Sequence, residues 1–204
     1  MTDLRQIADD IYSKEKTNSH YDLVVNYEKY KDVLDKYDYN DSQEKYDLFL
    51  QLKADYAIAL AEIKSYSKAL PQIDKALDLF TSDKQFDLEK VYTIKFYELL
   101  IWNRGRSNYY LENYSLAKSD FELLTKQYPD NTIYKKWLVA TTGIKKNKIK
   151  NILWYGLAGA LLVESFLDKW VVAKNIFLIV GLLCLIAAVG LEINMYLRKK
   201  KYVA

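Results

Sequence analysis

Few residues of the kinds that carry out catalysis occur in this sequence of 204 residues, and they are not grouped. There is one histidine, His20, and one cysteine, Cys184, so no intramolecular disulfide can form. The adjacent acids Asp9 and Asp10 suggest acid–base chemistry, but neighbouring residues on a helix do not face each other. The sequence contains no glycine-rich phosphate loop and no HExxH or GxSxG pattern. We therefore expect no enzymatic activity, no metal site and no cofactor.

Charge divides the chain into two regions. Residues 1–144 contain 20 Lys+Arg and 24 Asp+Glu, whereas residues 145–204 contain 10 and 3. The positive excess thus belongs to the C-terminal region and does not indicate a nucleic-acid-binding domain. The whole chain has only 6 Gly and 2 Pro, which favours long helices joined by short turns. The expected fold class is all-α.

Two apolar runs near the C-terminus, Ile152–Leu167 and Ile176–Leu197, indicate a transmembrane helical hairpin. The second would span about 33 Å as a helix, enough for a hydrocarbon core of about 30 Å. The first is shorter, but Trp170–Val172 can extend it. We expect spans at about 152–172 and 176–197. A hairpin buried in a soluble core is the alternative, and it fits poorly with the strongly charged remainder of the chain.

Basic residues flank this pair of runs and predict its orientation. Lysine and arginine close to a span mark the cytoplasmic side, so both termini are expected to be cytoplasmic. Trp154 and Trp170 lie about 24 Å apart on a straight helix and are expected at the two headgroup levels. The N-terminus lacks a secretory signal, and the Lys-, Tyr- and Asn-rich composition suggests a bacterial inner membrane. The other expected interface residues are Lys145, Lys146, Lys148, Lys150, Arg198, Lys199, Lys200 and Lys201.

Two acids lie in or near the apolar runs. Glu192 is close to Arg198 and is expected at the cytoplasmic interface. Glu164 is expected at the other interface, or else paired across the hairpin or within an oligomer, because an unpaired intramembrane acid is costly. Close helix packing is favoured by small residues four apart, namely Gly156 with Ala160 and Cys184 with Ala188.

The N-terminal region contains an internal repeat. Leu52–Phe80 aligns without gaps to Leu100–Pro129. The second segment resembles a tetratricopeptide repeat, and the first resembles it less fully. The matching positions are Gly105, Tyr114, Ala117, Phe121 and Pro129 in the second segment, and Ala57, Tyr66, Ala69 and Ala76 in the first.

The resemblance implies helical hairpins stacked into a solenoid. Gly105 would let paired helices approach closely, and Pro129 would end the last one. We expect a repeat domain over residues 1–148, with repeats at about 4–37, 50–81 and 98–131. A closing helix at 132–148 would run into the membrane region, residues 149–204. The first repeat would contain helices Leu4–Lys16 and Tyr21–Tyr37, and Asp41 or Ser42 would cap the next helix. The helix Val91–Tyr110 would be lengthened from about Gln85.

In such repeats the first helix of each pair lines a concave groove. The candidate groove residues are Trp102, Asn103, Arg106, Tyr109 and Tyr110. Tryptophan, tyrosine and arginine dominate binding hot spots, although tyrosines also pack between helices without a ligand. The family's clamp for a terminal carboxylate is not expected, because Asp55 and Ile58 stand at two of its positions.

These observations predict a membrane-anchored adaptor that binds a protein or peptide partner in its cytoplasmic groove. Besides that partner, we expect contact with membrane lipids but not with nucleic acid. The sequence leaves open whether the protein forms homo-oligomers. A first alternative is a subunit or regulator of a pore or transporter whose hairpin oligomerises. A second is a self-assembling structural protein.

Overall fold

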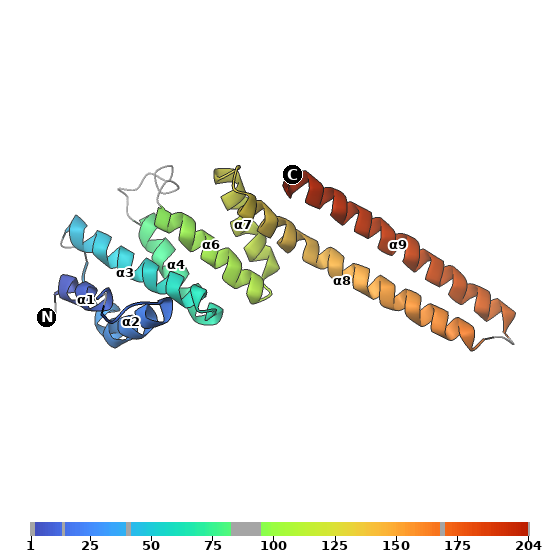
Figure 1. Cartoon of the computed structure of the whole chain (residues 1–204), viewed down its shortest axis with the longest axis horizontal. Coiled ribbons are helices and arrows are strands. Elements are labelled where there is room, and N and C mark those ends of the chain that lie inside the picture. The colour runs from blue at the N-terminus through green and yellow to red at the C-terminus, as the bar shows by residue number, and fades with distance from the viewer. Residues whose placement is uncertain (1–2, 14, 40–41, 83–94, 168–169, 204) are drawn as a thin grey trace. The chain divides into compact units, whose positions relative to one another are not determined.

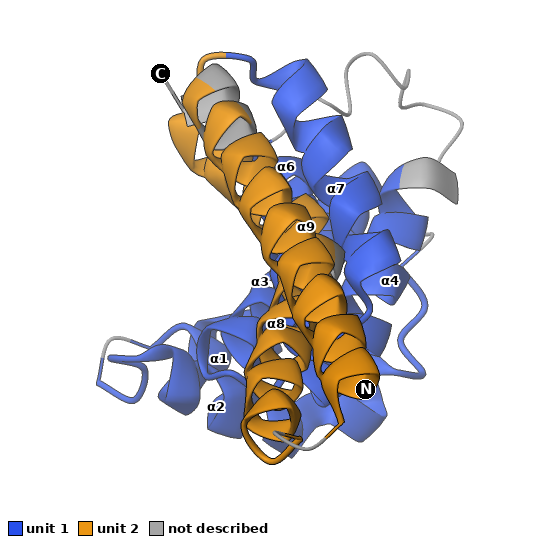
Figure 2. Ribbon diagram, turned by 90° about the vertical axis from the view of Figure 1, so that its right-hand side faces the viewer, with its two compact units in different colours: residues 1–129 blue, residues 130–204 orange. Residues whose placement is uncertain are grey.

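The computed structural model describes residues 3–13, 15–39, 42–82, 95–167 and 170–203 (Figure 1). Within these ranges the chain forms helices and turns and no strand, so the all-α prediction is confirmed. The chain divides into two compact units, residues 1–129 and residues 130–204 (Figure 2). The expected extension of a helix from Gln85 lies outside the described residues.

The first unit is built from helices that pack in consecutive pairs. Its helices are α1 (Leu4–Ile11), α2 (His20–Leu34), α3 (Gln43–Glu62), α4 (Tyr66–Ser82), α6 (Lys95–Tyr110) and α7 (Tyr114–Gln127). The pairs are α1 with α2, α3 with α4, and α6 with α7. In addition, α3 contacts both α1 and α6, and α4 contacts α6. The first helices of successive pairs therefore lie side by side.

Polar caps define where several helices begin. The Ser42 hydroxyl accepts a hydrogen bond from the Lys45 amide, which confirms this residue as the cap of α3. α1 ends at Ile11 instead of Lys16, since the Thr17 hydroxyl donates to the Ile11 carbonyl at 2.6 Å. α2 likewise ends at Leu34, before the expected Tyr37.

The α3–α4 and α6–α7 turns have the same backbone structure. Lys64 and Glu112 adopt left-handed conformations with φ of 63° and 64°. The next amide in each turn, of Ser65 or Asn113, bonds back to a helical carbonyl at 2.8 Å. This is the hydrogen-bond pattern of a helix that ends in a left-handed residue. The internal repeat seen in the sequence therefore extends to the backbone of the turns.

The second unit is a hairpin of two long helices, α8 (Thr132–Ser165) and α9 (Val171–Val203). α8 runs without a break from the expected closing helix into the first apolar run, as predicted. It ends at Ser165 because the Phe166 and Leu167 amides bond to the carbonyls of Val163 and Glu164. Residues 171–172, which were expected in the first span, therefore belong to α9.

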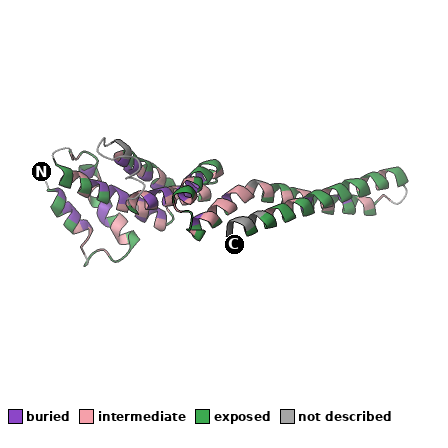
Figure 3. Ribbon diagram, turned by 90° about the horizontal axis from the view of Figure 1, so that it is seen from above, coloured by how far each residue is buried: buried purple, intermediate pink, exposed green. Residues whose placement is uncertain are grey.

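Among the described helices, α9 alone contains a segment long and apolar enough to cross a membrane, Val171–Leu197. Only 11% of the most apolar part of this segment is buried. Most of the surface of the apolar hairpin is exposed in the structure, in contrast to the first unit (Figure 3).

Candidate functional site

The candidate groove residues all lie on α6, the first helix of the last hairpin in the first unit. Trp102, Arg106 and Tyr110 are four residues apart and so share one face of α6. This face adjoins α3 at Arg106, which bonds to Glu62 of α3. The structure therefore brings the groove candidates together with residues of the preceding hairpin.

Arg106 connects the two hairpins. Its Nη1 donates to the Glu62 carboxylate of α3 at 2.6 Å and to the Asn103 side-chain oxygen at 3.2 Å. Its guanidinium also lies 5.7 Å from the centre of the Trp102 ring, within the range of a cation–π contact. The charge of Arg106 is thus neutralised within the protein, so it is poorly placed to receive an anionic ligand.

Asn103 forms part of the floor of this face. It is 1% exposed, and its amide nitrogen donates to the Leu99 carbonyl at 2.9 Å. Both ends of the side-chain amide therefore have partners inside the protein. Because neighbouring side chains cover Asn103, a ligand on this face would contact those neighbours instead of Asn103 itself.

The tyrosines at the end of α6 form an aromatic cluster that spans both hairpins. Tyr110 stacks on Tyr66 of α4 with ring centres 4.7 Å apart and planes 7° apart. Tyr109 makes edge-on contacts with Tyr110 at 5.6 Å and with Tyr114 of α7 at 5.7 Å. Tyr110 remains 51% exposed. We call Tyr66, Tyr109, Tyr110 and Tyr114 the tyrosine cluster; it is the most accessible part of the candidate groove.

The α3 part of the same face has its polar groups engaged as well. The hydroxyl of Tyr12, the residue that follows α1, donates to the Asp55 carboxylate at 2.6 Å. Burial raises the pKa of Asp55, and this effect outweighs the opposing hydrogen bonds from Tyr12 and Gln51. Asp55 and Glu62 thus join neighbouring first helices to one another, and neither presents an unpaired carboxylate.

The residues that matched the repeat pattern lie at helix–helix contacts. A Cβ atom added at Gly105 would come within 2.9 Å of the Phe121 ring and 3.2 Å of the Asp120 Cβ. α6 and α7 approach closely at this point only because residue 105 has no side chain. The small and apolar repeat residues Ala57, Ala69, Ala76, Ala117 and Phe121 are fully buried, and Pro129 follows the end of α7.

A half-buried arginine, Arg104, pairs with the buried Asp120 next to the same glycine. Arg104 donates to both carboxylate oxygens of Asp120, the shortest contact being 2.7 Å, and lies 3.4 Å from Asp74 of α4. These bonds hold α4, α6 and α7 together. The sequence pattern did not single out this network, which depends on residues far apart in the chain.

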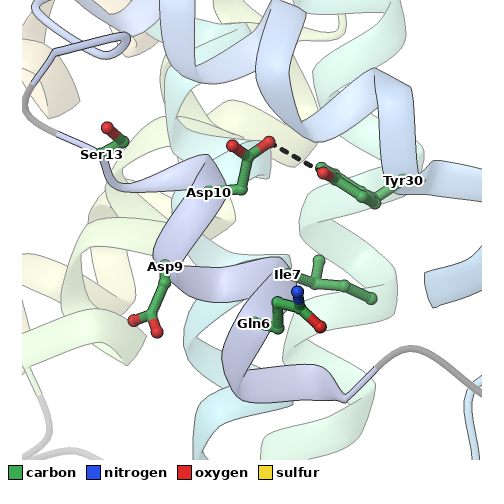
Figure 4. A pocket seen from close by; sticks show the side chains of 6 residues that line it. All are labelled: Gln6, Ile7, Asp9, Asp10, Ser13 and Tyr30. Atoms are coloured by element: carbon green, nitrogen blue, oxygen red, sulfur yellow. Dashed lines mark hydrogen bonds between the residues drawn. The ribbon is translucent and has the colours of Figure 1, made fainter.

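A shallow hollow of about 390 Å³ lies between α1 and α2 (Figure 4). The Asp10 carboxylate points toward Tyr30 and accepts its hydroxyl at 2.8 Å, whereas Asp9 points elsewhere. Lys16 also pairs with Asp10, and these bonds hold the pKa of that carboxyl below its usual value. The two acids do not share a site. Among the described residues no group of three His, Cys, Asp or Glu side chains could hold a metal ion.

In the second unit, polar contacts join both ends of the apolar hairpin. Near the interhelical turn, Lys174 pairs with Glu164 at 3.2 Å. At the other end, Lys150 pairs with Glu192 at 3.3 Å. Lys146 donates to Asn194 at 2.6 Å. Glu164 is therefore paired across the hairpin, one of the arrangements considered from the sequence.

The remaining interface candidates are distributed along the hairpin. Trp154 and Trp170 are exposed, as are Lys148 and Lys200. The side chains of Lys145, Arg198, Lys199 and Lys201 lie outside the described part of the structure.

Comparisons of the chain with protein-family models, curated proteins and solved structures found no significant match.

Proposed function

We propose that this protein is a membrane-anchored adaptor. Its α1–α2, α3–α4 and α6–α7 hairpins would form a short solenoid of the tetratricopeptide type, and α8–α9 would be a two-span membrane anchor. The protein would recruit a partner to the membrane without catalysing a reaction. Tethering raises the effective concentration of a bound partner, so a modest affinity would suffice.

The exposed apolar surface of the hairpin is the observation that carries this proposal. Soluble proteins rarely expose apolar patches larger than a few hundred Å². A helix that is apolar all round needs either a protein core or a membrane around it. The described part of the chain supplies no such core, since only 11% of the most apolar part of α9 is buried. Lipid would cover the rest.

The orientation follows from the flanking lysines. Those near the start of the first run and after the second favour a cytoplasmic location for both termini, with residues 166–170 on the opposite side. The composition favours a bacterial inner membrane. Because Glu164 has its partner within the hairpin, it gives no particular support to a pore formed by several copies.

The repeat arrangement supports a protein-binding role for the first unit. First helices that contact one another in succession and two turns of identical geometry are features of stacked repeats. The tyrosine cluster lies at the junction of two such hairpins and includes an exposed ring. Since Arg106, Glu62 and Asp55 already have partners, the bound segment would be apolar or aromatic instead of a terminal carboxylate.

Capture of the full-length protein from gently solubilised membranes tests the recruitment step. The Tyr110→Ala variant removes the exposed ring of the cluster, whereas Tyr21→Ala removes an exposed tyrosine from α2 as a matched control. A hot-spot residue costs about 2 kcal/mol when truncated, so the partner should be recovered about 30-fold less well with Tyr110→Ala. Equal recovery with both variants would contradict the assignment of the partner to this face.

A second variant separates the two parts of the proposal. Replacing residues 149–204 with an unrelated two-span anchor should leave partner recovery unchanged. Loss of the partner on this exchange would place the interaction in the membrane and favour the alternative of a subunit of a membrane complex.

A further inference from the structure

The polar contacts across the hairpin form two layers with an apolar zone between them. The turn-side layer is the Lys174–Glu164 pair at 3.2 Å. The tail-side layer contains the Lys150–Glu192 pair at 3.3 Å and the Lys146–Asn194 hydrogen bond at 2.6 Å. Each layer takes one lysine or more from one helix and an acid from the other. The charges within the hairpin are therefore compensated at two defined depths.

A seam of small residues connects these layers. Gly156 on α8 faces the Cys184 sulfur, which is 3.3 Å from the position of a Cβ at that glycine. Gly181 on α9 faces Ala160 in the same way, at 3.6 Å. The seam contacts and the polar layers all fit one antiparallel register. Sliding one helix by a turn, about 5.4 Å, would break the ion pairs and the seam together.

Val171–Leu197 is long enough in total to cross a membrane, but it includes Lys174 and Glu192, so the apolar stretch between the two polar layers is shorter than an average span. Between the polar residues, α8 has the 12-residue apolar stretch Ile152–Val163, and α9 has the 16-residue stretch Ile176–Leu191. At about 1.5 Å per residue these stretches are about 18 and 24 Å long. An average hydrocarbon core is about 30 Å thick. Tilting the hairpin would shorten its span further, so tilt cannot correct the mismatch.

We infer that the hairpin fits a bilayer with a hydrocarbon core of about 18–24 Å, so that its natural partner is a thin bilayer of short-chain lipids. This inference rests on the proposed membrane anchoring. The Lys174–Glu164 and Lys150–Glu192 pairs lie at the two headgroup levels. In a thicker membrane, the lipid around the hairpin must thin, the lysine side chains must extend toward the headgroups, or the charged layers must enter the hydrocarbon.

Reconstitution into vesicles of graded thickness tests the inference. The full-length protein is added to vesicles of dimyristoleoyl, dioleoyl or dierucoyl phosphatidylcholine, and carbonate-resistant protein is measured after flotation. We expect the greatest insertion in the thinnest vesicles and about tenfold less in the thickest. The double variant Glu164→Leu with Lys174→Leu removes the turn-side layer and should shift the optimum to thicker vesicles. The control Lys118→Leu with Glu122→Leu changes an exposed pair on α7 and should not shift it.

A variant with the two charges exchanged controls for a loss of insertion that does not depend on the position of the ion pair. Glu164→Lys with Lys174→Glu keeps the pair at the same depth, so it should keep the preference for thin vesicles. Equal insertion of the wild type in all three lipids, or no shift for the leucine variant where it inserts, would overturn the thickness inference while leaving the anchor intact. Failure of the wild type to insert in any lipid would overturn the proposed anchor itself.

Discussion

Replacing Gly105 with alanine should destabilise the first unit, although alanine is the better helix former. The added Cβ would lie 2.9 and 3.0 Å from two ring atoms of Phe121 and 3.2 Å from the Asp120 Cβ. Favourable carbon–carbon contacts lie at about 3.5–4.0 Å. Neither neighbour can retreat freely, because Phe121 is fully buried and Arg104 holds Asp120.

The expected size follows from two opposing effects. Overpacking of a tight core costs about 1–3 kcal/mol, and the upper part of this range, about 2–3 kcal/mol, applies here because the added Cβ would lie 3.2 Å or less from three atoms. Replacing glycine with alanine inside a helix stabilises the helix by about 1 kcal/mol. The net loss should be about 1–2 kcal/mol, which corresponds to a 5- to 30-fold change in an opening equilibrium constant at about 1.4 kcal/mol per factor of ten.

Hydrogen–deuterium exchange of the full-length protein in detergent can measure this change for each helix separately. Amides of α6 and α7 should exchange about 5- to 30-fold faster in Gly105→Ala. Gly143→Ala on α8 is the control, because a Cβ there would meet nothing within 4 Å and exchange should slow. If Gly105→Ala left α6 and α7 unchanged or better protected, the close approach of the helices at this glycine would be refuted.

Three further perturbations test other parts of the structure. Lys64→Gly should raise the free energy of unfolding by about 1 kcal/mol, because Lys64 has a left-handed φ of 63°; an unchanged urea midpoint would contradict this. Lys53 is 7% exposed and lies 2.6 Å from the Asp35 carboxylate. Its hydrogen bond lowers the Asp35 pKa below the ordinary value of 3.8. The pair therefore stabilises the folded state fully above pH 3.8, and this stabilisation is lost as the pH falls through the lowered pKa. Asp35→Asn should flatten the acid limb of a stability–pH curve, and an unaltered limb would exclude this pair as its source. Glu62→Ala and Arg106→Ala should show a coupling of about 1 kcal/mol in a double-mutant cycle, whereas simple additivity would mean that the pair does not join the hairpins.

Much of the fold could be predicted because its signals are local in the sequence. The scarcity of glycine and proline pointed to helices, and Ser42 marked the start of α3. Between Thr132 and Ile152 there is no Gly or Pro cluster and only Gly143 interrupts the stretch, which predicted one helix running into the first apolar run, and α8 has that form. In each case the deciding residues lie within a few positions of the feature that they determine.

Features set by tertiary geometry could not be predicted in this way. Lys64 and Glu112 occupy left-handed turn positions for which glycine is the usual signal, so their residue types did not indicate this conformation. Tyr27 and Tyr56 stack with ring centres 3.9 Å apart, yet they belong to different hairpins. No local pattern pairs residues at such separations.

In the candidate site, too, the local features could be predicted from the sequence and the tertiary contacts could not. The spacing of Trp102, Arg106 and Tyr110 was enough to place them on one face of a helix. It could not show that Arg106 is paired with Glu62 of α3, since that contact depends on how α3 and α6 pack. The pairing is a second argument against a terminal carboxylate as the ligand, because an arginine that is already neutralised is a poor receptor for an anion.

Thiol labelling in sealed membrane vesicles tests the central claim of a two-span anchor most directly. The native Cys184 lies midway along α9, and Ser67→Cys and Ser165→Cys can each be introduced alone in a Cys184→Ala background. With a membrane-impermeant maleimide, Ser67→Cys should react only from the cytoplasmic side and Ser165→Cys only from the opposite side. Cys184 in the wild type should react from neither side until detergent is added. Labelling of Ser67→Cys and Ser165→Cys from the same side, or free labelling of Cys184, would contradict the account.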